Sequence, residues 1–197
     1  MSLFDPEGNR LYLTAEERAA FMAAASRADR PVRTLCSVLH FTGCRISEAL
    51  SLTPRRVDLS GRAVVFETLK KRRTGVFRSV PVPPSLLDSL DMVHGIREQQ
   101  KRRQGLGDEE PLWPWHRSHA WRLVKAVMRE AGIPDGPHAT PKGLRHGYGV
   151  AAIISGVPLN MLSKWMGHAT LEVTAIYANA LGAEERSIAE RMWKEAV

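Results

Sequence analysis

The sequence has little cysteine and no long apolar run. Its two cysteines, Cys36 and Cys44, are too few for the disulfide framework of a small secreted protein. No segment approaches the ~20 apolar residues that a membrane helix needs. The N-terminus also lacks the basic and then apolar regions of a signal peptide. We therefore expect a cytoplasmic protein that makes no contact with a membrane.

The cysteines do not indicate a metal site either. Together with His40 they are spaced as Cys-x3-His-x3-Cys, which could place three ligands on one face of a helix. No fourth ligand lies nearby in the sequence, and no Cys-x-x-Cys motif occurs. We interpret these residues as part of a core face with buried, reduced thiols. We expect no metal and no other cofactor.

Acidic residues are scarcer than basic ones. The chain has 28 Lys and Arg against 21 Asp and Glu, which gives a net charge of +7, and its pI is about 9.8. This balance favours a polyanionic partner, and nucleic acid is the first candidate. Charge alone leaves open the alternative of a mildly basic protein with no such partner.

Local patterns predict one mostly helical domain over residues 1–197, large enough to bury its own core. Thr14 and Glu17 form a capping box at the start of the first helix. Two apolar segments, 63–66 and 76–82, predict a β-hairpin with its turn at 74–75. The expected helices cover residues 15–27, 31–41, 46–50, 84–99, 118–131, 141–154, 158–166, 171–178 and 183–195. The fold class is therefore α+β, mostly α, with a small antiparallel sheet, a loop at 99–110 and a C-terminal helix.

Residues suited to phosphodiester chemistry follow one another along the chain. They are Arg45, Arg145, His168 and Tyr177. An arginine guanidinium is a planar fork of donors that stays charged and matches phosphate oxygens. A tyrosine can act as a covalent nucleophile. This order suggests a phosphate clamp combined with a nucleophile.

Neighbouring residues support the clamp. Glu48 follows Arg45 by three residues in a predicted helix, so the two side chains should be in contact. Thr140–Pro141 is a strong helix start. It puts Lys142 and Arg145 on one face near a helix N-terminus, which favours an anion. The alternative for Lys142 and Arg145 is a solvated helix face.

The predicted hairpin is strongly basic. A run of four bases is most often a solvated loop, but on a hairpin of a basic protein it favours contact with DNA. The run begins at Lys70, and the residues expected to touch DNA are Lys71, Arg72, Arg73 and Arg78.

In these segments the chain resembles the tyrosine recombinases, the phage-integrase-like site-specific DNA recombinases. Their catalytic domains carry a Thr-Gly-x-Arg-x-x-Glu segment, a basic hairpin, a His-x-x-Arg-His box, a Leu-Gly-His box and a tyrosine nine residues further on. The matching segments are Thr42–Glu48, the basic hairpin, Lys142–His146, Met166–His168 and Tyr177. Four boxes in the correct order are far more specific than any one of them. The resemblance covers most of the chain and implies an integrase-like catalytic domain.

The resemblance implies a metal-independent enzyme that breaks and rejoins double-stranded DNA. Arg45 and Arg145 would hold the non-bridging oxygens of the phosphodiester. Tyr177 would form a 3′-phosphotyrosyl link, which a 5′-hydroxyl can reverse without ATP. His168 would hydrogen-bond the phosphate or the attacking oxygen, and Glu48 would orient Arg45. The outcome would be DNA integration, excision or inversion.

The resemblance also implies a general acid on the hairpin, which protonates the leaving 5′-oxygen. The segment Thr68–Lys70 favours Lys70 for this role, and Lys71 is second. Counting back from Val80 could align Arg73 instead, but an arginine scarcely loses its proton.

One residue departs from the family pattern. Lys142 stands where the family most often has histidine, and a lysine must first be neutral before it can act as a base. It can still donate to a phosphate oxygen or to the tyrosine. His146 is a candidate substitute as proton acceptor, although in the family pattern its position looks more like structural support.

The two ends of the chain bear on which further domain and which partner chains we expect. Only about a dozen residues precede the first expected helix, so we expect the family's N-terminal core-binding domain to be absent. Both a minimal recombinase and a part of a longer protein fit this. The segment 179–197 carries an apolar stripe that either packs in cis or docks on a neighbouring protomer. The resemblance implies a homo-tetramer on DNA, and an accessory DNA-binding protein is another expected partner.

Two alternative functions remain open at the level of sequence. One is a nicking-closing enzyme of the type IB topoisomerase class, which would use the same residues. The other is a DNA-binding regulator without catalysis, for which Tyr177 would have no use. Trp113, Trp115 and Trp121 are interpreted as core and loop packing rather than as platforms for stacked bases.

Overall fold

The part of the chain that the structure describes is mostly helical. The computed structural model describes residues 2–68, 75–102, 110–179, 186 and 189–190. Its helices are α1 (Ala15–Ala25), α2 (Arg30–Thr42), α3 (Ile46–Leu50), α4 (Pro84–His94), α5 (Ile96–Arg102), α6 (Arg117–Glu130), α7 (Pro141–Ile154), α8 (Leu159–Met166) and α9 (Leu171–Ala175), with the 3-10 turns η1 (Pro54–Arg56) and η2 (Ile176–Asn179). The strands are β1 (Val57–Asp58), β2 (Ala63–Glu67) and β3 (Phe77–Pro81). The predicted α+β class with a small antiparallel sheet is confirmed.

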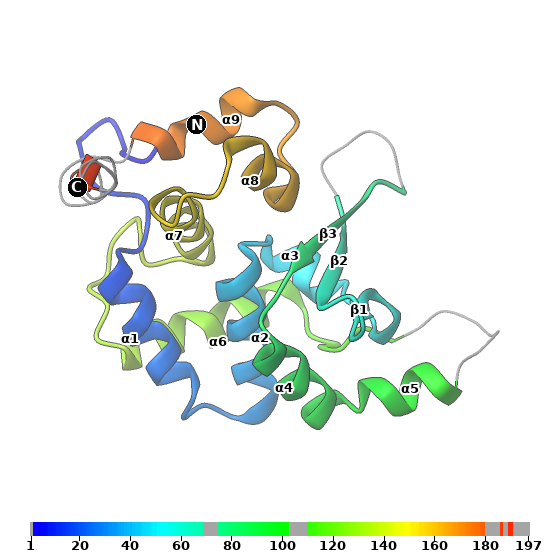
Figure 1. Cartoon of the computed structure of the whole chain (residues 1–197). Coiled ribbons are helices and arrows are strands. Elements are labelled where there is room, and N and C mark those ends of the chain that lie inside the picture. The colour runs from blue at the N-terminus through cyan, green and yellow to red at the C-terminus, as the bar shows by residue number, and fades with distance from the viewer. Residues whose placement is uncertain (1, 69–74, 103–109, 180–185, 187–188, 191–197) are drawn as a thin grey trace.

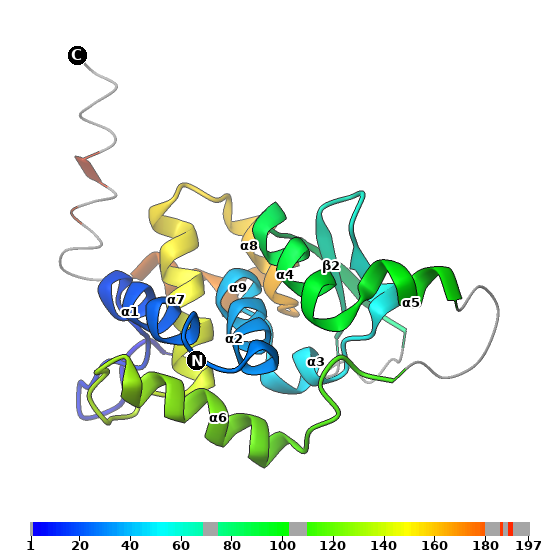
Figure 2. The ribbon, with the colours of Figure 1, turned by 90° about the horizontal axis from the view of Figure 1, so that it is seen from below.

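Helix α2 lies at the centre of the fold. It packs against α1, α3, α4, α6 and α7, and the sheet lies to one side of this helical group (Figure 1). Helix α6 runs along one edge of the group, where it contacts α1, α2, α3 and α7 (Figure 2). Helices α8 and α9 pack on each other beside the end of the sheet, and α8 contacts β3. Helix α7 contacts α2, α8 and η2, and α2 leads through Gly43 to the predicted site before α3, so the predicted sites lie on connected elements.

The sheet has the strand order β1-β2-β3, and both pairs are antiparallel. Val64 pairs with Val80, and Phe66 pairs with Arg78. Residues on β3 alternate between exposed and buried, so that Arg78 and Val80 share the inward face. This register carries a charged side chain into the interior at Arg78.

Local signals explain several helix ends. The capping box of Thr14 and Glu17 is confirmed, and Thr140 caps α7 by accepting a hydrogen bond from Gly143 N–H at 3.0 Å. Helix α2 ends at Gly43, whose φ of +58° is in the left-handed region that glycine tolerates. The chain then turns and begins α3 directly after Arg45.

Three local predictions were wrong. The helix expected over 84–99 is two helices, because Gly95 adopts a φ of +61° and ends α4. The second of these, α5, extends to Arg102 into the expected loop at 99–110, of which 103–109 lie outside the described residues. The two-residue strand β1 was missed, since a segment that short shows no alternation.

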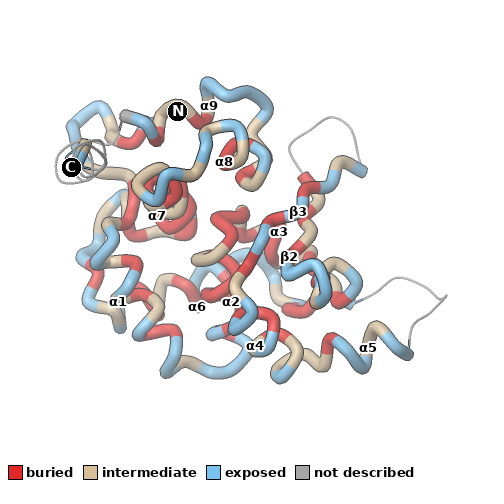
Figure 3. Tube along the Cα trace, in the orientation of Figure 1, coloured by how far each residue is buried: buried red, intermediate tan, exposed pale blue. Residues whose placement is uncertain are grey.

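The interior consists of two apolar clusters. The larger one runs through α1, α2, α4, α6 and β2, and the smaller one includes Leu3, Tyr12, Val150 and Tyr177. Figure 3 shows the buried stretches in α2, α7 and the sheet. Both cysteines are buried free thiols, as predicted. The described residues contain no cluster of side chains suited to a metal ion, and none of their helices is both long and apolar enough to cross a membrane.

Candidate functional site

Two arginines from distant parts of the chain meet at the candidate site. Arg45 precedes α3, and Arg145 lies on the second turn of α7. The Arg145 guanidinium is buried and donates to the carbonyl oxygens of Gly43 at 2.6 Å and Met166 at 2.7 Å. Burial, with the nearby charge of Arg45, lowers its pKa to about 10, so it stays protonated at neutral pH. The fold thus holds two fixed positive charges together.

Glu48 connects the first of these arginines to the sheet. Its buried carboxylate accepts from Arg45 Nη1 at 2.8 Å, so the predicted contact is confirmed. The backbone N–H of Arg45 donates to the other oxygen, also at 2.8 Å. Arg78 Nη2 donates to the same oxygen at 2.6 Å. Although burial raises the pKa of Glu48, the hydrogen bond and charge of Arg78, helped by Arg45, hold it below its usual value.

Arg78 is buried, contrary to the prediction from the sequence. We expected it on the DNA-contacting surface of the hairpin, but only 6% of it is exposed. All three guanidinium nitrogens donate, to Glu48, to Thr68 Oγ1 at 3.3 Å and to the carbonyl oxygen of Trp165 at 2.8 Å. The guanidinium also stacks over the ring of Phe66, 5.2 Å from its centroid. The inward face of β3 is the physical reason, since Arg78 shares it with Val80.

Tyr177 lies beside this cluster with its side chain fully buried. Its hydroxyl is 3.2 Å from Nδ1 of His146. The ring of His168 stacks nearly parallel to the Tyr177 ring, 6.2 Å away. His168 Nδ1 is hydrogen-bonded to Thr174 Oγ1 at 2.8 Å, which fixes the orientation of the imidazole. The predicted nucleophile and both predicted histidines therefore meet in one place.

Burial and the positive cluster shift the pKa values of these groups. Burial raises the pKa of Tyr177 to about 12, although Arg145 and Arg45 oppose the shift. Burial, with the charges of Lys142 and Arg145, lowers the pKa of His146 to about 4. Burial, with the charges of Arg145 and Arg45, lowers the pKa of His168 to about 3. At neutral pH both histidines are neutral and the phenol keeps its proton.

Of the remaining predicted site residues, the structure describes Lys142 but not the hairpin bases. Lys142 lies exposed on the first turn of α7, one turn before His146 on the same helix face. The hairpin bases Lys70, Lys71, Arg72 and Arg73 lie outside the described residues.

Three structural features of the site were missed from the sequence. Thr174 orients His168, Gly149 packs against the Tyr177 ring, and Arg78 joins Glu48. Side chains alternate between the two faces of a strand, so the predicted strand could have shown that Arg78 points inward together with Val80. No sequence signal distinguishes Thr174, because its role depends on how α9 packs on α8, and the contact of Gly149 with Tyr177 depends on how η2 packs against α7.

The close packing at Gly149 leads to a prediction. A Cβ at this position would lie 2.5 Å from Cε1 of Tyr177, so Gly149→Ala must displace the ring. We expect it to lower the free energy of unfolding by ~1–3 kcal/mol, the usual cost of overpacking. In a Tyr177→Ala background the same change should be neutral or stabilising, because alanine favours a helix over glycine by ~1 kcal/mol. Thermal or denaturant unfolding of the four proteins measures the difference; equal losses in both backgrounds would contradict the contact.

One buried and two half-buried histidines predict a pH dependence of stability. The pKa values of His40, His146 and His168 are lowered to about 3, 4 and 3, chiefly by burial. Their unfolded values are ~6.5, so the stability they confer is complete above that pH and is lost as pH falls toward the folded values. Carboxylates titrate at ~4 when unfolded, so the histidines dominate between pH 7 and 5. We expect unfolding at pH 5 to take up at least ~2 protons, measured as the slope of stability against pH. His146→Gln should reduce that slope, and a flat profile would contradict the burial.

The exposed face of α6 is basic and carries an aromatic ring. Arg117, Arg122 and Arg129 are exposed, and Lys125 lies over the Trp121 ring at 6.0 Å. Trp121 is 41% exposed, so its interpretation as packing was wrong; it faces outward on α6. Trp113 is buried and donates to the Pro31 carbonyl oxygen, as a core residue would.

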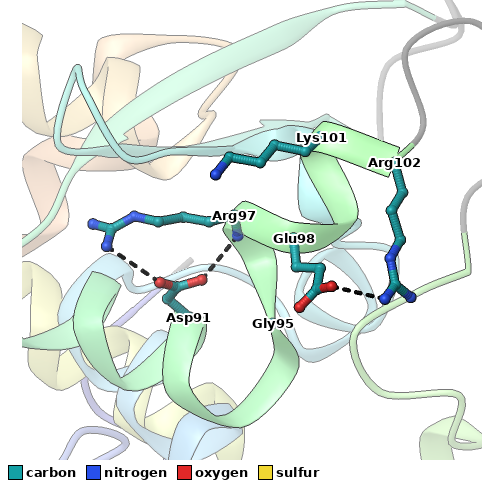
Figure 4. A pocket seen from close by; sticks show the side chains of 6 residues that line it. All are labelled: Asp91, Gly95, Arg97, Glu98, Lys101 and Arg102. Carbon is teal, nitrogen blue, oxygen red and sulfur yellow. Dashed lines mark hydrogen bonds and ion pairs between the residues drawn. The ribbon is translucent and has the colours of Figure 1, made fainter.

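A separate shallow pocket lies on α4 and α5. It is lined by Asp91, Gly95, Arg97, Glu98, Lys101 and Arg102 (Figure 4). Asp91 pairs with Arg97, and Glu98 pairs with Arg102 at 2.7 Å. Its charges are largely paired within the pocket, and none of the predicted catalytic residues lines it.

Comparison with known proteins identifies related sequences. The model of the phage integrase family matches residues 11–184. The tyrosine recombinase XerD of Mycobacterium leprae is 30% identical over 180 residues, which cover 84% of this chain and 55% of that protein. The chain therefore spans little more than half the length of this relative.

Solved structures share the fold. The crystal structure of XerA recombinase superposes with a TM-score of 0.76 over 92% of this chain and 64% of that chain, at 23% identity. XerH site-specific recombinase bound to its difH substrate gives a TM-score of 0.70 over 96% of this chain and 59% of that chain, at 17% identity. These two likenesses show the fold alone, and they confirm the predicted integrase-like architecture.

Proposed function

Because the chain belongs to the phage integrase family, we propose that it is a site-specific recombinase that cleaves and rejoins double-stranded DNA in the cytoplasm. The observation that carries the proposal is the meeting of Arg45, Arg145, His168 and Tyr177 in one partly buried, positively charged place. XerH site-specific recombinase, which has the same fold, was solved bound to its difH substrate. The basic face of α6 offers a further surface for phosphates.

The reaction we propose uses no metal. Arg45 and Arg145 hold the non-bridging oxygens and stabilise the charge of the pentacoordinate transition state. The Tyr177 hydroxyl gives its proton to Nδ1 of His146, the candidate acceptor 3.2 Å away, as the ring leaves that contact. The Tyr177 oxygen then forms a bond to phosphorus, the bond to the 5′-oxygen breaks, and the leaving oxygen takes a proton from the hairpin lysine, Lys70 in our assignment. Attack by a 5′-hydroxyl on the 3′-phosphotyrosyl bond reverses these steps. His168, oriented by Thr174, donates to the phosphate through its second ring nitrogen.

We also propose a resting position for Tyr177. A fully buried phenol cannot meet a DNA phosphate, so the ring has to leave its contacts with His146 and Gly149 before it attacks. In this scheme His146 supports the nucleophile by holding its hydroxyl. Lys142, exposed one turn nearer the N-terminus of α7, donates to a phosphate oxygen.

Recombination requires several active sites on two duplexes, so we propose a homo-tetramer on DNA. The segment 179–197 is the part we propose to dock on a neighbouring protomer; all of it except residues 179, 186 and 189–190 lies outside the described residues. An accessory DNA-binding protein would close the other side of the duplex.

The proposed function is tested by trapping. The protein is incubated with supercoiled DNA from the source genome, denatured, and covalent adducts are recovered and their DNA ends sequenced. We expect adducts clustered at one site, and junctions between strands when two copies of that site are supplied. Relaxation of supercoils at scattered sites without junctions would favour the topoisomerase-like activity. Sequence-preferring DNA binding without any adduct would favour the regulator.

A further inference from the structure

We propose that Arg78 is a positioning residue that sets the phosphate clamp, rather than a contact to DNA. This inference rests on the proposed function and adds a residue to that site. Arg78 touches neither the proposed nucleophile nor a position open to a phosphate, since it is buried with its three guanidinium nitrogens occupied. Its effect on the reaction therefore passes through the residues that it holds.

The first of these residues is Glu48. Arg78 donates to both oxygens of this carboxylate, at 3.3 Å and 2.6 Å. The same carboxylate accepts from the side chain and the backbone of Arg45. A carboxylate held by four hydrogen bonds has little freedom to rotate, so the Arg45 guanidinium is fixed in one orientation. Without Arg78, Glu48 could turn with Arg45 as a pair.

The second contact is the end of α8. Arg78 Nε donates to the Trp165 carbonyl oxygen, and Arg145 Nη2 donates to the next carbonyl oxygen, that of Met166. Two cations thus bind adjacent carbonyls at a helix C-terminus, where the helix dipole favours positive charge. These bonds fix the segment that leads to His168 and place both arginines against the same turn.

Gly167 supplies independent evidence for this packing. A Cβ at Gly167 would lie 3.0–3.1 Å from three atoms of the Arg78 side chain, and its φ is +65°. The glycine between Met166 and His168 therefore leaves room for the guanidinium. Gly167 of the Met-Gly-His box and Arg78, 89 residues apart in sequence, form one packed unit.

These contacts join three elements of the site. Arg78 links Glu48 on α3, Thr68 just after β2 and the C-terminus of α8. A shift in any of them changes the distance between Arg45, Arg145 and the phosphate that they bind. A misplacement of ~1 Å in such a site costs ~100-fold in rate.

The test uses a substrate whose phosphate carries no charge. The DNA site recovered from wild-type adducts is synthesised with either a normal or a methylphosphonate linkage at the cleaved position. An arginine that neutralises a non-bridging oxygen is needed much less when that oxygen is replaced by methyl. If Arg78 acts through the clamp, Arg78→Met should lower cleavage of the normal site by ~100-fold and of the methylphosphonate site by less than ~10-fold.

Four further variants separate positioning from folding. Arg45→Ala should also lose much more cleavage rate on the normal site than on the methylphosphonate site. Adding Arg78→Met to Arg45→Ala should lower the rate on either substrate little further, because Arg45 and Arg78 act as a unit. Arg78→Lys keeps a positive charge beside Glu48, so it controls for loss of folding. Its cleavage rate on the normal site should lie between the rates of wild type and Arg78→Met. His94→Ala removes a hydrogen-bonded imidazole on α4, outside the site, and should leave both rates unchanged.

Each outcome decides the inference. Equal losses on the two linkages, or additive losses with Arg45→Ala, would overturn it and leave Arg78 with a structural role only. Rates like wild type in folded Arg78→Met would overturn it as well. If the wild-type protein itself forms no adduct, the proposed function fails, and the role of Arg78 in that reaction fails with it. The first three results leave the proposed function intact, so the two failures are distinguishable.

Discussion

Arg145→Lys should lower the rate of covalent adduct formation by ~100- to 1,000-fold, the usual cost of losing one donor to a transition-state oxyanion. Arginine at this position is held by two hydrogen bonds, to the carbonyl oxygens of Gly43 and Met166, which aim its planar fork. Lysine keeps the positive charge but offers a single ammonium on a flexible chain. Because the charge is retained, we expect the affinity for DNA to fall by less than ~10-fold.

The rate is measured in a single turnover on the DNA site recovered from adducts, with binding measured separately at the same salt concentration. Arg97→Lys is the matched control, because Arg97 is an exposed arginine on α5 that pairs with Asp91 on α4. It should leave the rate unchanged. If Arg145→Lys cleaved within ~5-fold of wild type, Arg145 would not be the phosphate-binding residue that we propose.

Glu48→Ala should cause the largest loss of stability. The Glu48 carboxylate is fully buried and is shared by Arg45 and Arg78, and the Arg78 side chain is itself only 4% exposed. Removing one partner of a buried ion pair leaves the other charge without compensation, which costs ~3–5 kcal/mol. That is a large share of the ~5–15 kcal/mol that stabilises a typical domain.

Denaturant unfolding of wild type, Glu48→Ala and Glu98→Ala provides the comparison. Glu98 pairs with Arg102 on the surface of α5 and is 68% exposed, so its loss should cost no more than ~0.5 kcal/mol. The double variant Glu48→Ala/Arg78→Met should recover part of the loss, because it removes the unpaired charge. A loss at Glu48 as small as that at Glu98 would show that the buried network contributes little to stability.

Much of the site could be predicted from sequence because its signals are local. The contact between Arg45 and Glu48 follows from their spacing on one helical turn, and Thr140–Pro141 marks the start of α7 by its capping chemistry. The order of the boxes around Arg45, Arg145 and Tyr177 led to the family that the comparison identifies.

The errors came from positions that packing decides. Arg78 was assigned to the surface because charged residues usually lie there, but its partner Glu48 is 30 residues away and allows it to be buried. No prediction was made for the burial of Tyr177, which depends on the contact between η2 and α7 and is encoded by no local pattern. Gly95 was placed inside a helix, where its propensity is poor, although its left-handed conformation ends α4.

Peptide mass spectrometry of the trapped adduct shows whether Tyr177 forms a covalent bond to a DNA phosphate. Trypsin cleavage after Lys164 and Arg186 gives a peptide in which Tyr177 is the only tyrosine. After nuclease digestion of the DNA, we predict that this peptide carries a nucleotide joined through its 3′-phosphate to Tyr177, and that Tyr177→Phe yields no adduct. A nucleotide on any other residue, or an adduct that persists in Tyr177→Phe, would contradict the account.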